Sequence, residues 1–203
     1  MKDNLARDLL EIKAVQINKD HYFTWTSGIK SPIYCDNRLT MSHPKVRKNI
    51  TEAFVSLVEK MEEKPEIIAG CATAGIPHAA WLADRLALPM VYVRSKPKGH
   101  GKGNQVEGEL PAGKRVLVIE DLISTGGSSL QAAEAVRREG GVVTGVAAIF
   151  TYGLEKADTV FQEAGINFST ITGFDQLLEA LTDDGELNEE DKRELLLWRD
   201  QLD

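Results

Sequence analysis

Apolar residues along the chain follow two different spacings, and each spacing predicts one type of element. Across residues 44–61 they recur every three or four positions, as at Val46 and Ile50, which indicates an amphipathic helix. Short unbroken apolar runs, such as "EIIAG" at 66–70 and "RVLVIED" at 115–121, instead indicate strands with both faces buried. From residue 66 onward the two kinds of segment alternate.

This alternation predicts the order of the elements. We predict helices at 3–13, 44–61, 75–88, 128–140 and 155–165, and strands at 66–70, 89–93, 115–121, 142–150 and 167–172. Residues 21–36 are typical of short strands joined by a tight turn. Ser42 is suited to cap the helix that follows at 44–61. The tail from 175 to 202 is expected to be helical with a break near Gly185. Strands that alternate with helices indicate one α/β domain over residues 1–203, with a mostly parallel central sheet flanked by helices.

The segment "VLVIEDLISTGGSS" (116–129) runs from a predicted strand into a predicted helix. Glu120 and Asp121 are neighbours at the end of the strand, so their side chains should point to opposite sides and do different work. The turn at 124–128 precedes a helix, whose free N–H groups and partial positive charge suit an anion, and its two glycines allow a phosphate to approach the backbone. The two acids could accept hydrogen bonds from a pair of sugar hydroxyls while the backbone amides of the turn bind a phosphate. This combination fits a ribose 5-phosphate. The alternative is an ordinary strand–turn–helix connection with an N-cap.

The periodic pattern disappears between residues 94 and 114. This stretch is too long for an ordinary strand connection in a compact domain, and its glycines at 99, 101 and 103 would allow it to open and close as a lid. Five basic residues fall within nine positions: Arg94, Lys96, Lys98, His100 and Lys102. The stretch is therefore either a disordered insert or a functional flap. In a flap such cations could stabilise negative charge on a leaving group, and the alternative for the basic residues is a solvated loop.

Three separated segments make the chain resemble one known family. "FTWTSGIKSPIYCD" (23–36), "RSKPKGHGKGNQVEG" (94–108) and "VLVIEDLISTGGSS" (116–129) resemble, in this order, segments of the orotate phosphoribosyltransferases, which belong to the type I phosphoribosyltransferases. The resemblance implies the type I phosphoribosyltransferase fold, with a small N-terminal hood over about residues 1–40 and a long flexible catalytic loop at 94–108. It also implies transfer of the 5-phosphoribosyl group from phosphoribosyl pyrophosphate to orotate, which gives orotidine 5′-monophosphate and pyrophosphate in de novo pyrimidine biosynthesis.

The resemblance also implies roles for individual residues. Those expected in catalysis are Arg94, Lys98, His100 and Asp121. Those expected to bind phosphoribosyl pyrophosphate are Arg94, Lys98, His100, Glu120, Asp121, Leu122, Ile123, Ser124, Thr125, Gly126, Gly127 and Ser128. Ser124 would also contact orotate, and "GCATAGIP" (70–77) would lie near the pyrophosphate. Mg²⁺ would enter as its complex with phosphoribosyl pyrophosphate, without a dedicated protein site, and a homodimer would share its active sites through the flexible loop.

The chain departs from the pattern of some family members where they carry lysine. Thr26, Ala74 and Ser95 stand at these positions, and "TYGLEK" (151–156) stands where some members have an arginine. The group that binds the orotate carboxylate is therefore left open between Lys30, Arg38 and backbone amides of the N-terminal lobe. Phe23 and Tyr34 either line the base pocket or pack as ordinary core aromatics.

Composition narrows the class of protein. The 203 residues are 42% hydrophobic and carry a formal net charge of −7, which argues against a nucleic-acid partner bound through a broad basic surface. Cys35 and Cys71 are isolated in the sequence, as expected of reduced thiols, and no apolar run is long enough for a membrane helix. We expect a cytoplasmic protein with neither nucleic-acid nor membrane partners. Two alternatives stay open: a phosphoribosyltransferase for another base, which the "SGIKSP" segment argues against, and a non-catalytic nucleotide-sensing regulator on the same fold.

Overall fold

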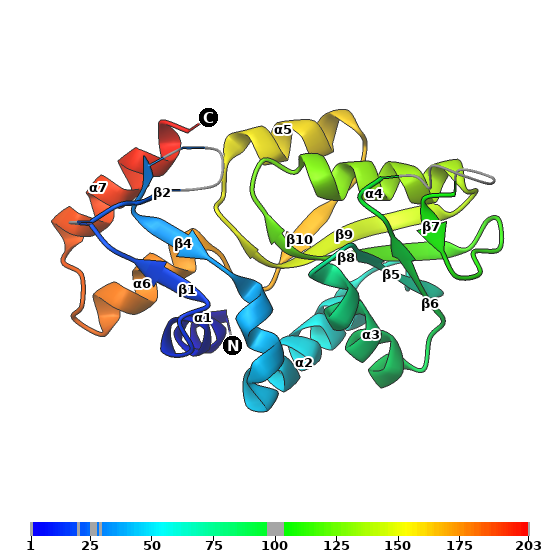
Figure 1. Ribbon diagram of the computed structural model, residues 1–203, viewed down its shortest axis with the longest axis horizontal. Coiled ribbons are helices and arrows are strands. Elements are labelled where there is room, and N and C mark those ends of the chain that lie inside the picture. Colours follow the sequence, from blue (N-terminus) through cyan, green and yellow to red (C-terminus); the bar gives the residue numbers. More distant parts are fainter. Residues whose placement is uncertain (1, 20, 25–27, 29, 97–103, 203) are drawn as a thin grey trace.

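The computed structural model describes residues 2–19, 21–24, 28, 30–96 and 104–202. Within this part of the chain the central feature is a six-stranded sheet of order β10-β9-β8-β5-β6-β7 (Figure 1). Its strands are β5 (Ile67–Cys71), β6 (Met90–Val93), β7 (Val106–Glu107), β8 (Arg115–Ile123), β9 (Val142–Thr151) and β10 (Phe168–Thr170). From β10 to β6 each strand is parallel to its neighbour, and β7 is antiparallel to β6. The predicted mostly parallel sheet is confirmed.

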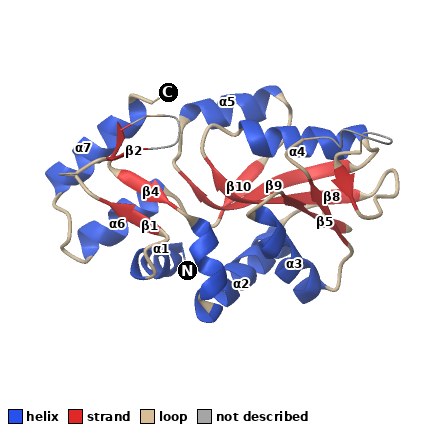
Figure 2. Ribbon diagram, in the orientation of Figure 1, coloured by secondary structure: helices blue, strands red, loops and turns tan. Residues whose placement is uncertain are grey.

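Helices cover both faces of this sheet (Figure 2). The helices α2 (Pro44–Lys60) and α3 (Gly75–Leu86) cover one face, and α4 (Gly127–Arg138) and α5 (Glu155–Glu163) cover the other. The side chains of β8 alternate between the two cores: Leu117 and Ile119 pack in the core on the α2–α3 side, whereas Val116 and Val118 pack in the core on the α4–α5 side. A strand buried on both faces needs apolar residues at every position, which explains the unbroken run read in the sequence.

Helix α3 packs unusually close to the sheet because of two glycines. A Cβ on Gly75 would collide with the carbonyl oxygen of Ile119 in β8, and one on Gly70 in β5 would lie 2.8 Å from the Cα of Ile76. The first turn of α3 therefore lies directly against β8. This contact brings the β5–α3 connection beside the end of β8.

A second lobe is built from both ends of the chain. Its N-terminal elements are α1 (Lys2–Glu11), β1 (Val15–Ile17), β2 (Phe23–Thr24), β3 (Lys30–Ser31) and β4 (Ile33–Cys35), and its C-terminal elements are α6 (Phe174–Asp183) and α7 (Glu189–Asp200). The two groups lie together at the left of Figure 1, joined by ion pairs between Arg7 and Asp184 (2.8 Å) and between Lys19 and Asp191 (2.6 Å). The N-terminal segment expected to form a hood thus lies against the C-terminal helices.

Local differences from the predicted elements have simple causes. A 3₁₀-helix, η1 (Asn37–Ser42), precedes α2, so Ser42 ends one helix and does not cap the next; the predicted N-cap was wrong, and His43 occupies that position. Strand β8 continues to Ile123 because β9 pairs with it up to Thr151, which places the two acids inside the strand. No helix in the described ranges has the length and apolar character needed to cross a membrane.

Candidate active site

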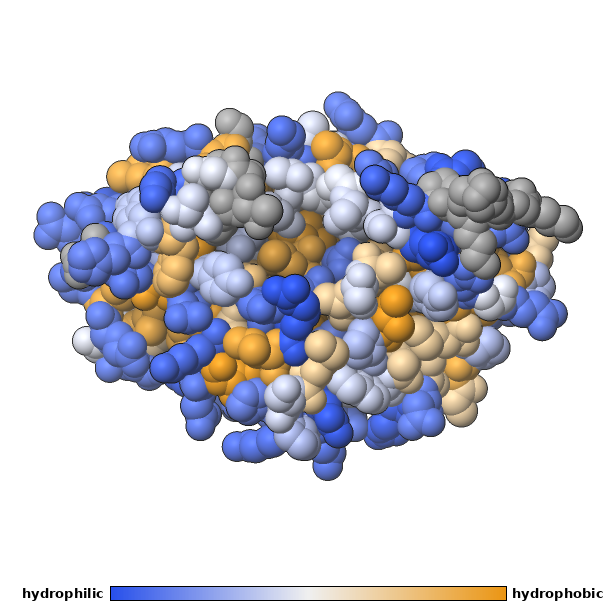
Figure 3. Space-filling view, viewed as in Figure 1, coloured by the Kyte–Doolittle hydropathy of each residue, from blue (hydrophilic) through white to orange (hydrophobic). Residues whose placement is uncertain are grey.

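A cleft of about 490 Å³ opens at the carboxyl ends of β5 and β8. These two strands are neighbours, but the chain leaves them toward opposite edges of the sheet, to β6 on one side and to β9 on the other. Such a switch in strand order is where parallel α/β sheets bind ligands. The cleft is lined by Cys35, Asp36, Arg38, Ala72, Thr73, Ala74, Glu120, Asp121, Leu122, Ser124, Thr125, Gly126, Gly127 and Ser128. The face of the molecule shown in Figure 3 is mostly hydrophilic, with smaller hydrophobic areas between.

Glu120 and Asp121 are neighbours in β8, and both line the cleft. Glu120 is only 7% exposed, and its Oε1 accepts a hydrogen bond from the backbone N–H of Asp121 (3.0 Å). Burial, and then the neighbouring Asp121 carboxyl, raise the pKa of Glu120 from 4.5 to about 9. Asp121 also acts on Cys35, whose thiol pKa is raised mainly by burial and further by Asp121. Glu120 also lines a smaller recess beside Ser128 and Gln131 of α4, and the carbonyl oxygen of Asp121 accepts a hydrogen bond from Asn37 in the N-terminal lobe.

The turn before α4 has the form expected of an anion site. Gly126 is the N-cap of α4 with φ +79°, a left-handed conformation that glycine adopts without strain. No side chain caps this helix, so its first N–H groups stay available to a ligand. A Cβ placed on Gly127 would meet nothing within 4 Å, so the backbone there is open to the approach of a phosphate.

The opposite wall comes from the connection between β5 and α3. Ala72, Thr73 and Ala74 line the cleft, and the Ala72–Thr73 peptide bond is cis. These small residues belong to the segment "GCATAGIP" expected near the pyrophosphate. Ala74 presents a methyl group at the position where some family members carry lysine.

The N-terminal lobe closes the cleft through the segment that follows β4. Arg38 donates from Nε and Nη2 to the Asp36 carboxylate at 2.6 and 2.9 Å, and both residues line the cleft. Between them Asn37 is buried, and its Nδ2 donates to the carbonyl oxygen of Asp121 (2.7 Å). The hydroxyl of Thr40 donates to the Asn37 carbonyl oxygen (2.6 Å), which helps hold this segment in place. Asn37 was not among the site residues predicted from the sequence, although the polar run "DNR" directly after an apolar strand is a recognisable signal.

Comparison with known proteins agrees with this geometry. The family model of the phosphoribosyl transferase domain matches residues 41–168. The chain is 63% identical over 202 residues to the orotate phosphoribosyltransferase of Oceanobacillus iheyensis, with both chains fully covered.

The chain belongs to the orotate phosphoribosyltransferase family.

Solved structures of similar fold support this membership. The orotate phosphoribosyltransferase of Aeropyrum pernix is 31% identical with a TM-score of 0.77, and the match covers 87% of this chain and 97% of that one. The UMP synthase of Leishmania donovani is 25% identical with a TM-score of 0.81; the match covers 98% of this chain and spans 42% of that protein. The family resemblance read from the three sequence segments is confirmed.

The other residues expected to bind the phosphoribosyl donor fall into two groups. Ser124, Thr125 and Ser128 lie in the wall of the cleft with the two glycines, and so does Leu122. Ile123 is 1% exposed and packs in the core on the α4–α5 side, so any contact from it would come from its backbone.

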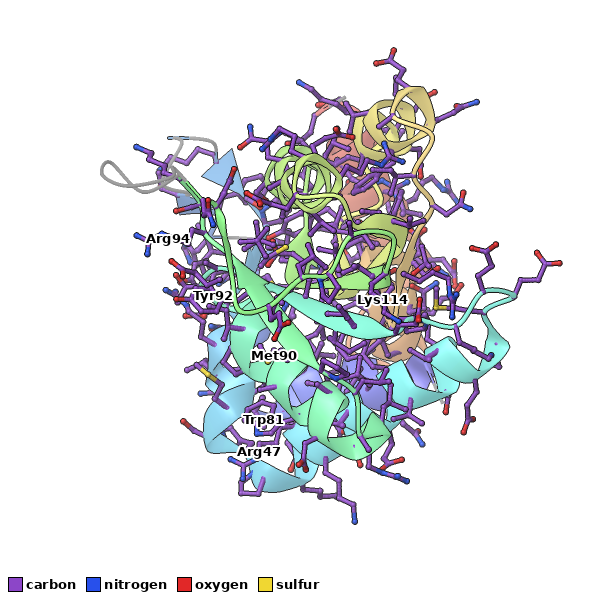
Figure 4. The ribbon with its side chains drawn as sticks, turned by 90° about the vertical axis from the view of Figure 1, so that its right-hand side faces the viewer. Arg47, Trp81, Met90, Tyr92, Arg94 and Lys114 are labelled. Atoms are coloured by element: carbon purple, nitrogen blue, oxygen red, sulfur yellow. The ribbon has the colours of Figure 1, made fainter. Side chains whose placement is uncertain are left out.

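The flap, the loop over residues 94–108, is described at its two ends, 94–96 and 104–108. Arg94 follows β6, beyond Met90 and Tyr92 along the strand (Figure 4), and its Nη1 lies 3.4 Å from Glu107 Oε1. Its backbone N–H donates to the carbonyl oxygen of Gln105 (2.9 Å), which ties the flap's start to its end. Arg94 and Glu120 both line a small recess next to the main cleft. Lys98 and His100, which were expected in catalysis, lie outside the described residues.

The candidate groups for the orotate carboxylate lie in different places. Arg38 lines the cleft, whereas Lys30 donates to the hydroxyl of Thr24 (2.7 Å) in the β2–β3 hairpin. Phe23 and Tyr34 have ring centroids 5.7 Å apart, and Tyr34 is 36% exposed, so Tyr34 is not an ordinary core aromatic. Thr26 lies outside the described residues, and Ser95 is exposed beside Arg94.

Proposed function

We propose that the chain transfers the 5-phosphoribosyl group from phosphoribosyl pyrophosphate to orotate, giving orotidine 5′-monophosphate and pyrophosphate, a step of de novo pyrimidine biosynthesis. One observation carries this proposal: the lining of a single cleft contains both an open helix N-terminus and two adjacent acids. Membership of the orotate phosphoribosyltransferase family supports it, because the relatives bear the name of this reaction.

The residues of β8 and the following turn bind the sugar phosphate in this scheme. The backbone amides and hydroxyls of residues 124–128 hold the 5-phosphate, helped by the partial positive charge of the α4 N-terminus. Glu120 and Asp121 hold the ribose hydroxyls. A carboxyl group with a raised pKa, such as that of Glu120, can donate a hydrogen bond to a sugar oxygen as well as accept one.

Displacement at the anomeric carbon follows from this seating. N1 of orotate gives up its proton and forms the new bond to C1 of the ribose while the C1–O bond to pyrophosphate breaks, so positive charge develops on the sugar and negative charge on the leaving group. Arg94, Lys98 and His100 of the flap stabilise the leaving pyrophosphate, and His100 gives a proton to one of its oxygens. Closure of the flap would exclude water, which strengthens these interactions.

The residues of the cleft fit a Mg²⁺ ion that arrives with the substrate. The described residues contain no group of three or more His, Cys, Asp or Glu that could hold a metal ion, but the two carboxyl groups of β8 provide the oxygen ligands that Mg²⁺ prefers. When bound with the pyrophosphate, Mg²⁺ would neutralise part of the charge on the leaving group. Glu120 and Asp121 are the residues that would contact this metal complex.

We also propose a cytoplasmic homodimer that shares its active sites and binds neither nucleic acid nor membranes. The flap leaves the sheet at the edge formed by β6 and β7, so a neighbouring subunit at that edge could receive it. The test is subunit mixing: an Asp121→Asn variant and a Lys98→Ala variant, each nearly inactive alone, should together recover about a quarter of the wild-type activity by random exchange. Absence of recovery after exchange has been demonstrated by tagged subunits would refute the shared site.

The activity itself is tested with the unmodified protein, Mg²⁺ and phosphoribosyl pyrophosphate. Orotate, uracil, hypoxanthine and adenine are supplied separately, and nucleotide and pyrophosphate are quantified by chromatography. We expect orotidine 5′-monophosphate and pyrophosphate in equal amounts from orotate, and far slower reaction with the purines. Turnover of a purine in preference to orotate would overturn the proposal.

A further inference from the structure

Acidic residues outnumber basic residues in the lining of the cleft. Three carboxyl residues, Asp36, Glu120 and Asp121, line it, whereas Arg38 is the one lysine or arginine among its described lining residues. The phosphate has the α4 N-terminus, and the ribose has the acids of β8. A substrate carboxylate needs a cation that is placed away from both, because the carboxylates of Asp36 and Asp121 in the lining repel it.

Arg38 has the orientation and the free capacity to meet a carboxylate. Its side chain is 64% exposed, and Asp36 engages its Nε and Nη2 with the two oxygens of one carboxylate. A guanidinium has five N–H donors, so this fork-like pair leaves others for a ligand. The hydrogen bond to Asp36 raises the pKa of Arg38 above its ordinary value, with smaller contributions from Tyr34 and Asp121.

Asp36 fixes the guanidinium without removing it from the cleft. Asp36 also accepts a hydrogen bond from the backbone N–H of Arg38 (3.2 Å), so the carboxylate is anchored to the start of η1. Asn37, between the two, is tied to the Asp121 carbonyl oxygen, which sets the position of this segment relative to the ribose site. The cation is thus held at a defined distance from the place where the sugar is expected.

We propose that Arg38 recognises the carboxylate of orotate and so selects orotate over uracil, the same base without that group. This inference rests on the proposed function and assigns a residue to a substrate group that the reaction itself leaves unassigned. Lys30 is the weaker candidate, because its ammonium group donates to Thr24 within the β2–β3 hairpin and it does not line the cleft. Asp36 acts as a positioning residue for Arg38.

The test compares two nucleotides that differ by this carboxylate alone. Dissociation constants of orotidine 5′-monophosphate and UMP are measured by calorimetry for the wild type and for Arg38→Gln, which keeps much of the length of the side chain but removes the charge. We expect binding of orotidine 5′-monophosphate to weaken about 10- to 100-fold, as for loss of a hydrogen bond to a charged group, and binding of UMP to change less than about twofold. The KM for orotate should rise by a similar factor, with the KM for phosphoribosyl pyrophosphate nearly unchanged.

Two control variants separate recognition from folding. Lys30→Gln removes a neighbouring cation of the lobe and should leave the ratio of the two dissociation constants unchanged. Asp36→Asn keeps the guanidinium but loosens it. Orotidine 5′-monophosphate should therefore lose affinity relative to UMP, but by less than in Arg38→Gln. If Arg38→Gln weakens both nucleotides equally, or neither, Arg38 does not read the carboxylate. That outcome with a wild type active on orotate would overturn this inference alone, whereas a wild type inactive on orotate would overturn the proposed function.

Discussion

Two adjacent glycines at the start of α4 should respond in opposite ways to the same substitution. Gly126 has φ +79°, and a Cβ there would lie 3.0 Å from Val160 Cγ2 and 3.0 Å from Phe161 Cε2. Gly127 is the first residue of α4, and a Cβ added to it would meet nothing within 4 Å. Gly126→Ala should therefore damage the fold, and Gly127→Ala should damage the binding of the phosphate.

The magnitudes follow from these two environments. At Gly126 the left-handed backbone costs an alanine about 1–2 kcal/mol, and crowding against the buried Phe161 adds about 1–3 kcal/mol. For a chain of this size each kcal/mol lowers Tm by roughly 2–4 °C, so we expect a loss of about 4–20 °C. At Gly127 alanine gains up to about 1 kcal/mol from its higher helix propensity. The alanine methyl group would instead occupy the space through which a phosphate reaches the backbone amides, so one charge-assisted hydrogen bond would be lost. Such a loss costs about 1.5–3 kcal/mol and weakens binding of the phosphate about 10- to 100-fold.

Calorimetric melting and steady-state kinetics distinguish the two variants. Gly127→Ala should melt within a few degrees of the wild type, with a raised KM for phosphoribosyl pyrophosphate and a KM for orotate that changes much less. Gly126→Ala should melt clearly lower. Wild-type affinity of Gly127→Ala for phosphoribosyl pyrophosphate would show that the phosphate does not bind at the α4 N-terminus, and the assignment of the whole cleft would fail with it.

Further predictions concern the polar groups around β8. Asn37→Ala removes the 2.7 Å hydrogen bond to the Asp121 carbonyl oxygen, which should cost about 1–3 kcal/mol of stability. Because Asp121 is then displaced, kcat/KM should fall roughly 10- to 100-fold. Unchanged kinetics would show that Asn37 is structural only. Burial raises the pKa of Glu120 from 4.5 to about 9, so its contribution to stability is complete below pH 4.5 and is lost as the pH rises through about 9. Between pH 5 and 9 the Tm of Glu120→Gln should therefore fall less than that of the wild type, and parallel melting curves would contradict the raised pKa.

The sequence predicted those parts of the molecule that local patterns determine. The unbroken apolar run of β8 indicated a strand buried on both faces, and its residues indeed divide between two cores. Glu120 and Asp121 follow directly at the end of this run, and both line the cleft. The turn from residue 124 to 128 was recognisable because glycine, hydroxyl residues and a following helix are together suited to bind a phosphate, wherever the rest of the chain lies.

The parts that the sequence did not predict depend on contacts between distant segments. Strand β8 extends past the acids because β9 pairs with it, and Ser42 loses its expected role because η1 forms before α2. The pairing of Asn37 with the Asp121 carbonyl oxygen joins residues 84 positions apart, and no local pattern specifies such a distance. A phosphate site made by one turn can thus be read from one segment, whereas the position of Arg38 depends on how the N-terminal lobe docks onto β8. Recognition of the base therefore rests on tertiary contacts, and the Arg38 variants test the group whose placement the local sequence could not determine.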